Sequence, residues 1–208
     1  MKSLPWDQQI ARVIVRPLVR TSVTPNQLTA ATLLLAIAGA ALLAVGDRHA
    51  ANWGAGMFVL ARFMDHFDGE LARQKGMASR FGYYFDYVAG ALSYGALFLC
   101  IGIGLRYGAL GGWALALGLA GTVSAVASMF VNLQIDKHQD GGGDGDAVGY
   151  PAFAGFELED GIYLLAPITW LGFLTPFFTA AAVGATVYCL WSLWTLIGLR
   201  RGRGVSGH

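Results

Sequence analysis

The chain has 208 residues and a net charge of +1; 55% of its residues are hydrophobic and only 13% are charged. Soluble domains carry about 25% charged residues, so this composition excludes an ordinary soluble domain. The near-neutral charge gives no reason to expect a nucleic acid as partner. The mean hydropathy of +0.52 instead indicates an all-α polytopic membrane protein. Cys100 and Cys189 lie in separate apolar runs, which suits buried hydrophobic positions better than a disulfide.

Residues 1–23 are typical of a juxtamembrane segment that carries an amphipathic surface helix. Ile10, Val13 and Ile14 recur at helical spacing, with arginines on another face. We expect this helix over residues 4–15, ended by a proline at position 17 that has no N–H to donate. The next helix is expected to start at Thr24-Pro25-Asn26, because threonine is a good N-cap and proline suits the first helical position.

Six spanning helices are expected within residues 24–200, followed by a basic C-terminal tail at 201–208. The first apolar run holds nineteen uncharged residues, which is long enough to cross a bilayer. The last apolar stretch is too long for one helix and is divided by Gly172 to Pro176, so we predict two helices there, the first of them short. The expected spans lie near residues 27–45, 51–73, 81–105, 109–133 and, after a polar loop at 136–159, in two parts of 161–199.

The basic residues predict the orientation of these spans. An even number of spans places both termini and the second and fourth connections on one side of the membrane. The other side holds only Arg48 and Arg106, and basic residues collect on the cytoplasmic side. Both termini are therefore expected on the cytoplasmic face of the inner membrane. The basic residues on that face are Lys2, Arg12, Arg16, Arg20, Arg73, Lys75, Arg80, Lys137, Arg200, Arg201 and Arg203.

Acidic residues cluster near the cytoplasmic ends of the second and third spans. Charges at membrane depth cost at least about 2.5 kcal/mol each, so they normally line a protein interior or a watery cavity. Because the connection is short, we expect the two helices to be antiparallel neighbours whose stripes face each other. The stripe on the second helix is Asp65, Asp68, Gly69 and Ala72, and the stripe on the third is Gly82, Asp86 and Gly90.

Three converging carboxylates repel one another unless a cation neutralises them. Mg²⁺ or Mn²⁺ fits this set, since hard divalent cations favour carboxylates together with substrate phosphates and water. The small residues would let a ligand approach the backbone. Arg73, and Arg62 one turn before Asp65, would offset charge or hold a phosphate. His66 and Glu70 fall off the stripe and are expected to pack rather than to bind.

The complete pattern is Asp65-x2-Asp68-Gly69-x2-Ala72-Arg73-x8-Gly82-x3-Asp86. It resembles the signature of the CDP-alcohol phosphotransferase family of membrane enzymes, and Thr24-Pro25-Asn26-x-Leu28-Thr29 before the first span is also similar. The resemblance implies six spans, a homodimer, and transfer of a phosphoalcohol from a CDP-linked lipid or alcohol donor to an acceptor alcohol, with release of CMP. It implies two metal ions in a complete site. If each position has the role of the matching position in the family pattern, the metal ligands are Asp65, Asp68 and Asp86. Gly69, Ala72 and Gly82 would then make room for the cytidine nucleotide.

Gly90 departs from the family pattern, which has a further aspartate there that resembles both a metal ligand and the catalytic base. Three interpretations follow: a working enzyme with its base elsewhere, an active protein impaired by substitution, or a pseudoenzyme that binds a CDP-lipid without turnover. The substitute bases considered are Asp144, Asp146, Glu157, Glu159 and Asp160. The residues considered for an acceptor phosphate are Arg16, Arg20, Arg80 and Lys137.

A small ion-coupled transporter is the alternative from another class. It would place polar residues at midplane on several helices. Here the acids cluster at one face, and the fourth span is mostly plain hydrocarbon. The pattern therefore favours an enzyme of phospholipid biosynthesis over a transporter.

Overall fold

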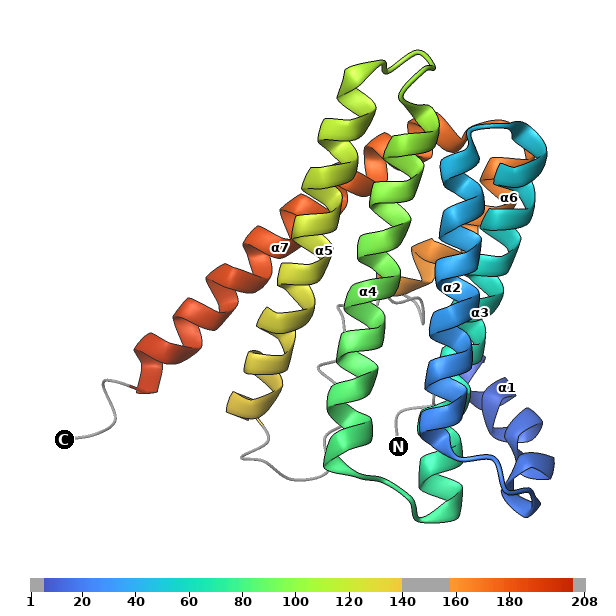
Figure 1. The fold of residues 1–208 in the computed structure, drawn as a ribbon. Coiled ribbons are helices and arrows are strands. Elements are labelled where there is room, and N and C mark those ends of the chain that lie inside the picture. The colour runs from blue at the N-terminus through green and yellow to red at the C-terminus, as the bar shows by residue number, and fades with distance from the viewer. Residues whose placement is uncertain (1–5, 140–157, 204–208) are drawn as a thin grey trace.

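The computed structural model describes the backbone of residues 6–139 and 158–203, with side chains for 10–137 and 161–201, and these residues form helices without any strand (Figure 1). A short helix, α1, precedes a bundle of long helices that run side by side. In chain order the elements are α1 (Trp6–Val15), the 3-10 helix η1 (Arg16–Arg20), α2 (Pro25–Val45), α3 (Arg48–Lys75), α4 (Arg80–Leu105), α5 (Gly112–Gln139), the 3-10 helix η2 (Leu158–Leu164), α6 (Leu165–Trp170) and α7 (Leu174–Arg203).

The predicted start of α2 is confirmed by its cap. The Thr24 hydroxyl accepts the N–H of Gln27 at 3.3 Å, and the Gln27 side chain accepts the N–H of Thr24 at 2.9 Å. This reciprocal pair satisfies two backbone donors that the first turn leaves open. The helix ends at Gly46, whose φ of 85° lies in the left-handed region that glycine adopts without steric cost.

The next two helices, α3 and α4, also begin with a side-chain cap, formed by one hydrogen bond each. The Asp47 carboxylate accepts the N–H of Ala50 at 2.9 Å, and the Ser79 hydroxyl accepts the N–H of Gly82 at 3.0 Å. Gly76, with a φ of 63°, terminates α3, and Ser79 is the N-cap of α4. The connection between α3 and α4 is therefore only a few residues long, and the two helices run in opposite directions.

α3 and α4 are antiparallel neighbours, as predicted, but side chains rather than backbones make the contact between them. The Phe58 ring of α3 packs edge to face on the Tyr94 ring of α4, with centroids 6.1 Å apart, and the Arg62 guanidinium lies over the same ring. Both helices pack on α2, and α4 also packs on α5, whereas α3 contacts α1 and α6. The sequence spacing could not reveal that α2 lies against both helices.

The spanning pattern is confirmed in its coarse form. Within the part of the chain that the structure describes, four helices are long and apolar enough to cross a membrane: α2, α4, α5 and α7. The 28-residue α3 has the length, about 42 Å at 1.5 Å per residue, but its second half is charged. The short fifth helix is present as α6, whose six residues rise only about 9 Å.

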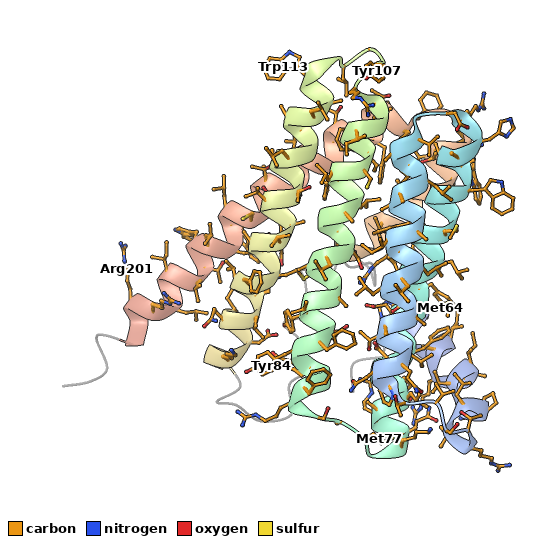
Figure 2. All side chains as sticks on the ribbon, in the orientation of Figure 1. Met64, Met77, Tyr84, Tyr107, Trp113 and Arg201 are labelled. Atoms are coloured by element: carbon orange, nitrogen blue, oxygen red, sulfur yellow. The ribbon has the colours of Figure 1, made fainter. Side chains whose placement is uncertain are left out.

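Large apolar side chains cover the outside of the bundle, as expected for a lipid-facing surface. Leu34 on α2, Trp53 on α3 and Trp194 on α7 are each at least 70% exposed. Tyr107 and Trp113 lie together at the end of the bundle away from α1 (Figure 2). Aromatic residues of this kind concentrate at the membrane interface, so that end marks one boundary of the bilayer.

Candidate metal centre

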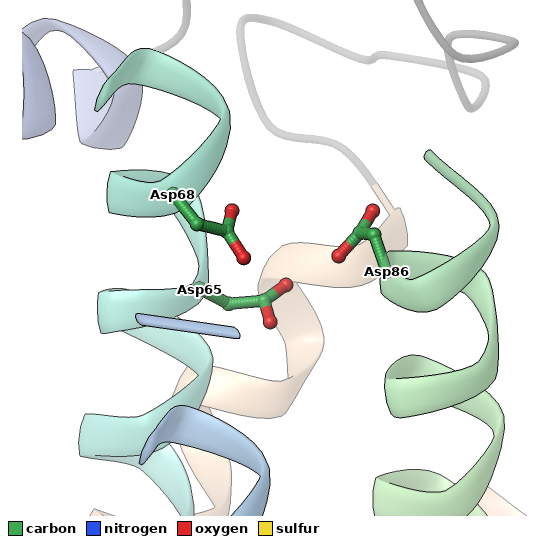
Figure 3. A group of neighbouring side chains, drawn as sticks. All are labelled: Asp65, Asp68 and Asp86. Carbon is green, nitrogen blue, oxygen red and sulfur yellow. The ribbon is translucent and has the colours of Figure 1, made fainter. Parts of the chain in front are cut away.

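Asp65 and Asp68 on α3 face Asp86 on α4 across the space between the two helices (Figure 3). One carboxylate oxygen from each residue lies within 4.8 Å of the other two. Asp68 is buried, Asp65 is half-buried and Asp86 is exposed. The group is therefore anchored on the α3 side and open on the side of α4.

Asp68 is held by two donors. The Thr29 hydroxyl on α2 donates to its Oδ2, and the N–H of Gly69 donates to its Oδ1 at 2.6 Å. Thr29 is only 3% exposed, so this is a buried, charge-assisted hydrogen bond. Thr29 was not predicted to belong to the site. The sequence signal that could have indicated it is a threonine one turn inside an apolar span, with Thr32 following at helical spacing.

Asp65 is paired with a cation on its own helix. Arg62 Nη1 lies 3.0 Å from Asp65 Oδ2, and the guanidinium also stacks over the ring of Tyr94 at 4.9 Å from the centroid. Three ionised carboxylates beside this one guanidinium leave a net charge of −2. A divalent cation would balance that charge, and carboxylate oxygens are the ligands that Mg²⁺ and Mn²⁺ prefer.

Arg73 and Glu70 form a separate group next to α1. Arg73 donates to Glu70 Oε2 from Nε at 3.1 Å and from Nη2 at 2.9 Å, and Gln74 donates to Glu70 Oε1 at 2.8 Å. Arg12 of α1 lies 3.9 Å from the same carboxylate. Glu70 thus turns away from the three aspartates, as its spacing predicted, and it engages the arginine that was predicted to hold a phosphate.

His66 contacts the segment that precedes α6. Its Nε2 lies 3.2 Å from the hydroxyl of Tyr163 on η2. This contact joins α3 to the segment that leads into α6. The expectation that His66 packs rather than binds agrees with this position.

The small residues border the site unequally. A Cβ added at Gly69 would meet only Arg73 Nη1, at 3.6 Å, so the space beside it is open. A Cβ at Gly82 would lie 3.1 Å from Asn26 Oδ1 and 3.2 Å from Ser79 Oγ, close against α2. Ala72 is half-buried. Gly69 therefore has room for a ligand beside it, whereas Gly82 lets α4 approach Asn26.

Gly90 lies one turn beyond Asp86, where α4 approaches α5. A Cβ there would lie 3.4 Å from Met129 Cε on α5. Residues four apart on a helix are offset by about 40°, so the stripe of Gly82, Asp86 and Gly90 drifts from α2 toward α5. Asp86, in the middle of the stripe, faces the two aspartates of α3 (Figure 3).

The other predicted residues lie away from the three aspartates or outside the described part of the chain. Arg16, Arg20 and Arg80 are exposed, and Lys137 Nζ lies 4.9 Å from the centroid of the Tyr84 ring. The side chains of the possible substitute bases fall outside the described residues. These are Asp144, Asp146, Glu157, Glu159 and Asp160.

A helical membrane bundle with three convergent carboxylates at one end of two helices defines a class: membrane proteins with an acidic, metal-compatible polar site. The family comparison makes this specific. Residues 22–198 match the model of the CDP-alcohol phosphatidyltransferase family. The chain belongs to that family, whose members are membrane transferases of phospholipid biosynthesis.

Individual relatives agree with the assignment. The chain is 37% identical over 92 residues to a phosphatidylinositol phosphate synthase of Corynebacterium glutamicum, a match that spans 42% of this chain and 41% of that protein. Crystal structures of the phosphatidylinositol phosphate synthase PgsA1 of Mycobacterium tuberculosis share the fold. The form with CDP-DAG bound has a TM-score of 0.68 at 22% identity and covers 90% of this chain and 94% of that one. The complex with manganese and citrate has a TM-score of 0.68 at 23% identity, covering 89% and 88%.

Proposed function

We propose that this protein binds a divalent metal and a CDP-linked donor between α3 and α4, and transfers a phosphatidyl-type group from the donor to an acceptor hydroxyl, releasing CMP. The observation that carries the proposal is the convergence of Asp65, Asp68 and Asp86 within 4.8 Å. The family match supports the reaction class, and the CDP-DAG bound to the M. tuberculosis relative supports a lipid donor.

The donor set fits Mg²⁺ or Mn²⁺. All three predicted ligands are carboxylates, their burial decreases from Asp68 to Asp86, and the net charge of −2 beside Arg62 calls for a cation. The manganese in the M. tuberculosis relative supports the same choice. A bound divalent cation would supply charge neutralisation on the phosphates and the leaving group. Asp65, Asp68 and Asp86 are the residues proposed to hold it.

Several residues of this chain have separate roles in the proposed transfer. Thr29 and the N–H of Gly69 keep the Asp68 carboxylate in place, and Arg62 restrains Asp65. The open space beside Gly69 can admit the nucleotide. In the transfer, the acceptor oxygen attacks the donor phosphorus next to the alcohol, the bond between that phosphorus and the bridging oxygen breaks, and CMP leaves. The acceptor hydroxyl proton must pass to a base, and glycine at position 90 provides none.

Gly90 therefore supports a second candidate, which is donor binding with little turnover. The position has no side chain, and Met129 lies beside it where a larger residue would project. A missing general base typically costs about 10²–10⁴ in rate. Metal and donor binding would survive this loss, because the three carboxylates remain.

The two candidates are separated by measuring CMP release from CDP-diacylglycerol, with a panel of acceptor alcohols, for this chain and for Gly90→Asp. The added side chain can be accommodated because the flexible end of Met129 is the nearest group, at 3.4 Å from the Cβ. We expect Gly90→Asp to raise CMP release by about 10²–10⁴.

The double variant Gly90→Asp, Asp68→Asn is the matched control and should release no CMP. Rapid turnover by the unmodified chain, with no gain in Gly90→Asp, would contradict the role assigned to position 90. If neither form releases CMP or binds CDP-diacylglycerol with Mn²⁺, the proposed function itself is wrong.

We further propose that the bundle crosses the membrane six times, with α3 and the η2–α6 segment as the crossings that composition alone does not identify. α3 runs along α2 over a comparable length, and its charged residue at membrane depth, Arg62, is paired with Asp65. The basic residues favour both termini and the metal centre on the cytoplasmic face. Cysteine labelling from each side of the membrane, at Tyr107 and at Arg201, would test the orientation.

A further inference from the structure

A buried carboxylate on α5 lies outside the three-aspartate group. Asp136 is 4% exposed, and its Oδ2 accepts hydrogen bonds from two tyrosines of α4: Tyr83 at 3.3 Å and Tyr87. The two rings pack edge to face with centroids 5.2 Å apart. Next to them Lys137 lies over the ring of Tyr84 at 4.9 Å. Polar and aromatic contacts thus join α4 to α5 near the cytoplasmic end of both helices.

The two tyrosines bracket Asp86. Tyr83 precedes it by three residues and Tyr87 follows it directly, so their hydroxyls connect the turn that carries Asp86 to a single oxygen on α5. The connection is buried, where an unsatisfied carboxylate is costly and the hydrogen bonds to it are strong. The turn is therefore restrained from the α5 side, by side chains that lie about 60° and 100° around the helix from Asp86.

This restraint matters because the backbones of α3 and α4 stay apart, and the side-chain contact between them at Tyr94 lies about two turns from Asp86. Two of the three carboxylates lie on α3 and the third on α4, so their spacing depends on the position of this end of α4. The helices that pack most extensively on α4 are α2 and α5. On the α5 side, Asp136 is the residue that holds this turn through hydrogen bonds.

We propose that Asp136 is a positioning residue: through Tyr83 and Tyr87 it holds Asp86 at the distance from Asp65 and Asp68 that a divalent cation requires. The inference deepens the proposed function and rests on its metal site. It assigns Asp136 no contact with the metal or the substrate. Partners that orient metal ligands indirectly typically account for about 10–100-fold in metal affinity.

The test is Mn²⁺ titration of the full-length protein in detergent, followed by electron paramagnetic resonance, for Asp136→Leu, Asp136→Asn and Thr122→Val. Asp136→Leu should weaken Mn²⁺ binding about tenfold. Asp136→Asn should stay within about twofold of the parent, because its amide oxygen still accepts from the tyrosines. Thr122→Val removes a different α4–α5 hydrogen bond, the 2.9 Å bond to Gly95 O, and should lower thermal stability without changing Mn²⁺ affinity.

Two results would overturn the inference. Unchanged Mn²⁺ affinity in Asp136→Leu would make Asp136 a structural tie only, and an equal loss in Asp136→Asn would point to charge rather than position. If Asp136→Leu does not fold, the double variant Tyr83→Phe, Tyr87→Phe gives the same test with the carboxylate retained. Its Mn²⁺ affinity should fall about tenfold, and an unchanged affinity counts against the inference.

A second readout separates this inference from the proposed function. Nitroxide labels at Leu60 on α3 and Phe81 on α4, both exposed, report the separation of the helices without any metal. Cys100 and Cys189 are replaced by alanine in this background. The distance distribution should broaden in Asp136→Leu and not in Thr122→Val. A parent protein that fails to bind Mn²⁺ while this broadening occurs would refute the metal site and still support the positioning role, whereas an unchanged distribution would refute the positioning role.

Discussion

The two ends of α4 are held in different ways. Away from the metal centre, backbones meet closely: a Cβ at Gly104 would lie 2.1 Å from the carbonyl oxygen of Leu43 on α2, and one at Gly102 would lie 2.6 Å from that of Ala114 on α5. At the end that carries Asp86, side chains make the contacts, with Tyr83 and Tyr87 reaching Asp136. Glycine contacts of the first kind let membrane helices approach and pack through van der Waals forces.

The difference shows how one helix can serve both the fold and a site. Close backbone packing leaves no room for a ligand, so it suits the end that only needs to be stable. The end with the three aspartates must keep a space between α3 and α4 for the proposed cation and substrate. Longer side chains can hold α4 there from the α5 side without closing that space.

The contrast is tested most directly by adding one methyl group at Gly104, at the end of α4 away from the metal centre, and one at Gly90, one turn from Asp86. Gly104→Ala should destabilise the protein by about 3 kcal/mol, since the Cβ would overlap a backbone oxygen that cannot move independently. Gly90→Ala should stabilise it by about 0.5 kcal/mol, because alanine is the better helix former and only the mobile end of Met129 is close. Thermal unfolding in detergent measures both. Equal changes in stability at the two positions would contradict the difference between close backbone packing at Gly104 and open packing at Gly90.

At the end with the three aspartates, Asp68→Asn should weaken Mn²⁺ binding by about a hundredfold. The reason is that Asp68 is the most buried of the three and the one held by Thr29. Isothermal titration calorimetry measures the change. Asp47→Asn, the same substitution at a helix cap on the opposite end, should bind Mn²⁺ like the parent; a loss there as well would indicate a general effect on folding.

Thr29→Val tests how much α2 contributes to the stability of the end with the three aspartates. Losing a buried hydrogen bond to a carboxylate should lower the stability of the metal-free protein by about 2 kcal/mol. Thr32→Val is the control, since its hydroxyl donates only to the Thr29 carbonyl of its own helix at 2.9 Å. Comparable unfolding temperatures for the two variants would show that the Thr29–Asp68 bond contributes little.

The smallest expected effect is at the contact between α1 and α3. Glu70→Gln weakens its pairing with Arg73 and Arg12, both of which are largely exposed, so the loss should be about 0.5 kcal/mol. Tryptic cleavage after Arg12 should become about twofold faster in consequence. Mn²⁺ affinity should not change; a tenfold loss of affinity would place Glu70 at the metal centre after all.

Several features of the fold follow from local rules and were predictable. The capping box at Thr24, the end of α1 before Pro17 and the division of the last apolar stretch near Gly172 depend only on neighbouring residues. The end of α5 was not predicted. The helix continues through Asp136 to Gln139, where polar residues indicated a loop. Asp136 is buried against two tyrosines, and this tertiary contact outweighs the polar composition.

The sequence by itself determined the membrane class and the group of Asp65, Asp68 and Asp86, because apolar length and helical periodicity are properties of the chain alone. Only the tertiary structure decided what surrounds that group. In the structure, Thr29 donates a hydrogen bond to Asp68, Met129 lies beside Gly90, and Asp136 accepts a hydrogen bond from the tyrosine next to Asp86. The physical reason is that a helical stripe drifts by about 40° every four residues. Which neighbouring helix each residue meets therefore depends on how the helices pack, and spacing along one helix does not contain that information.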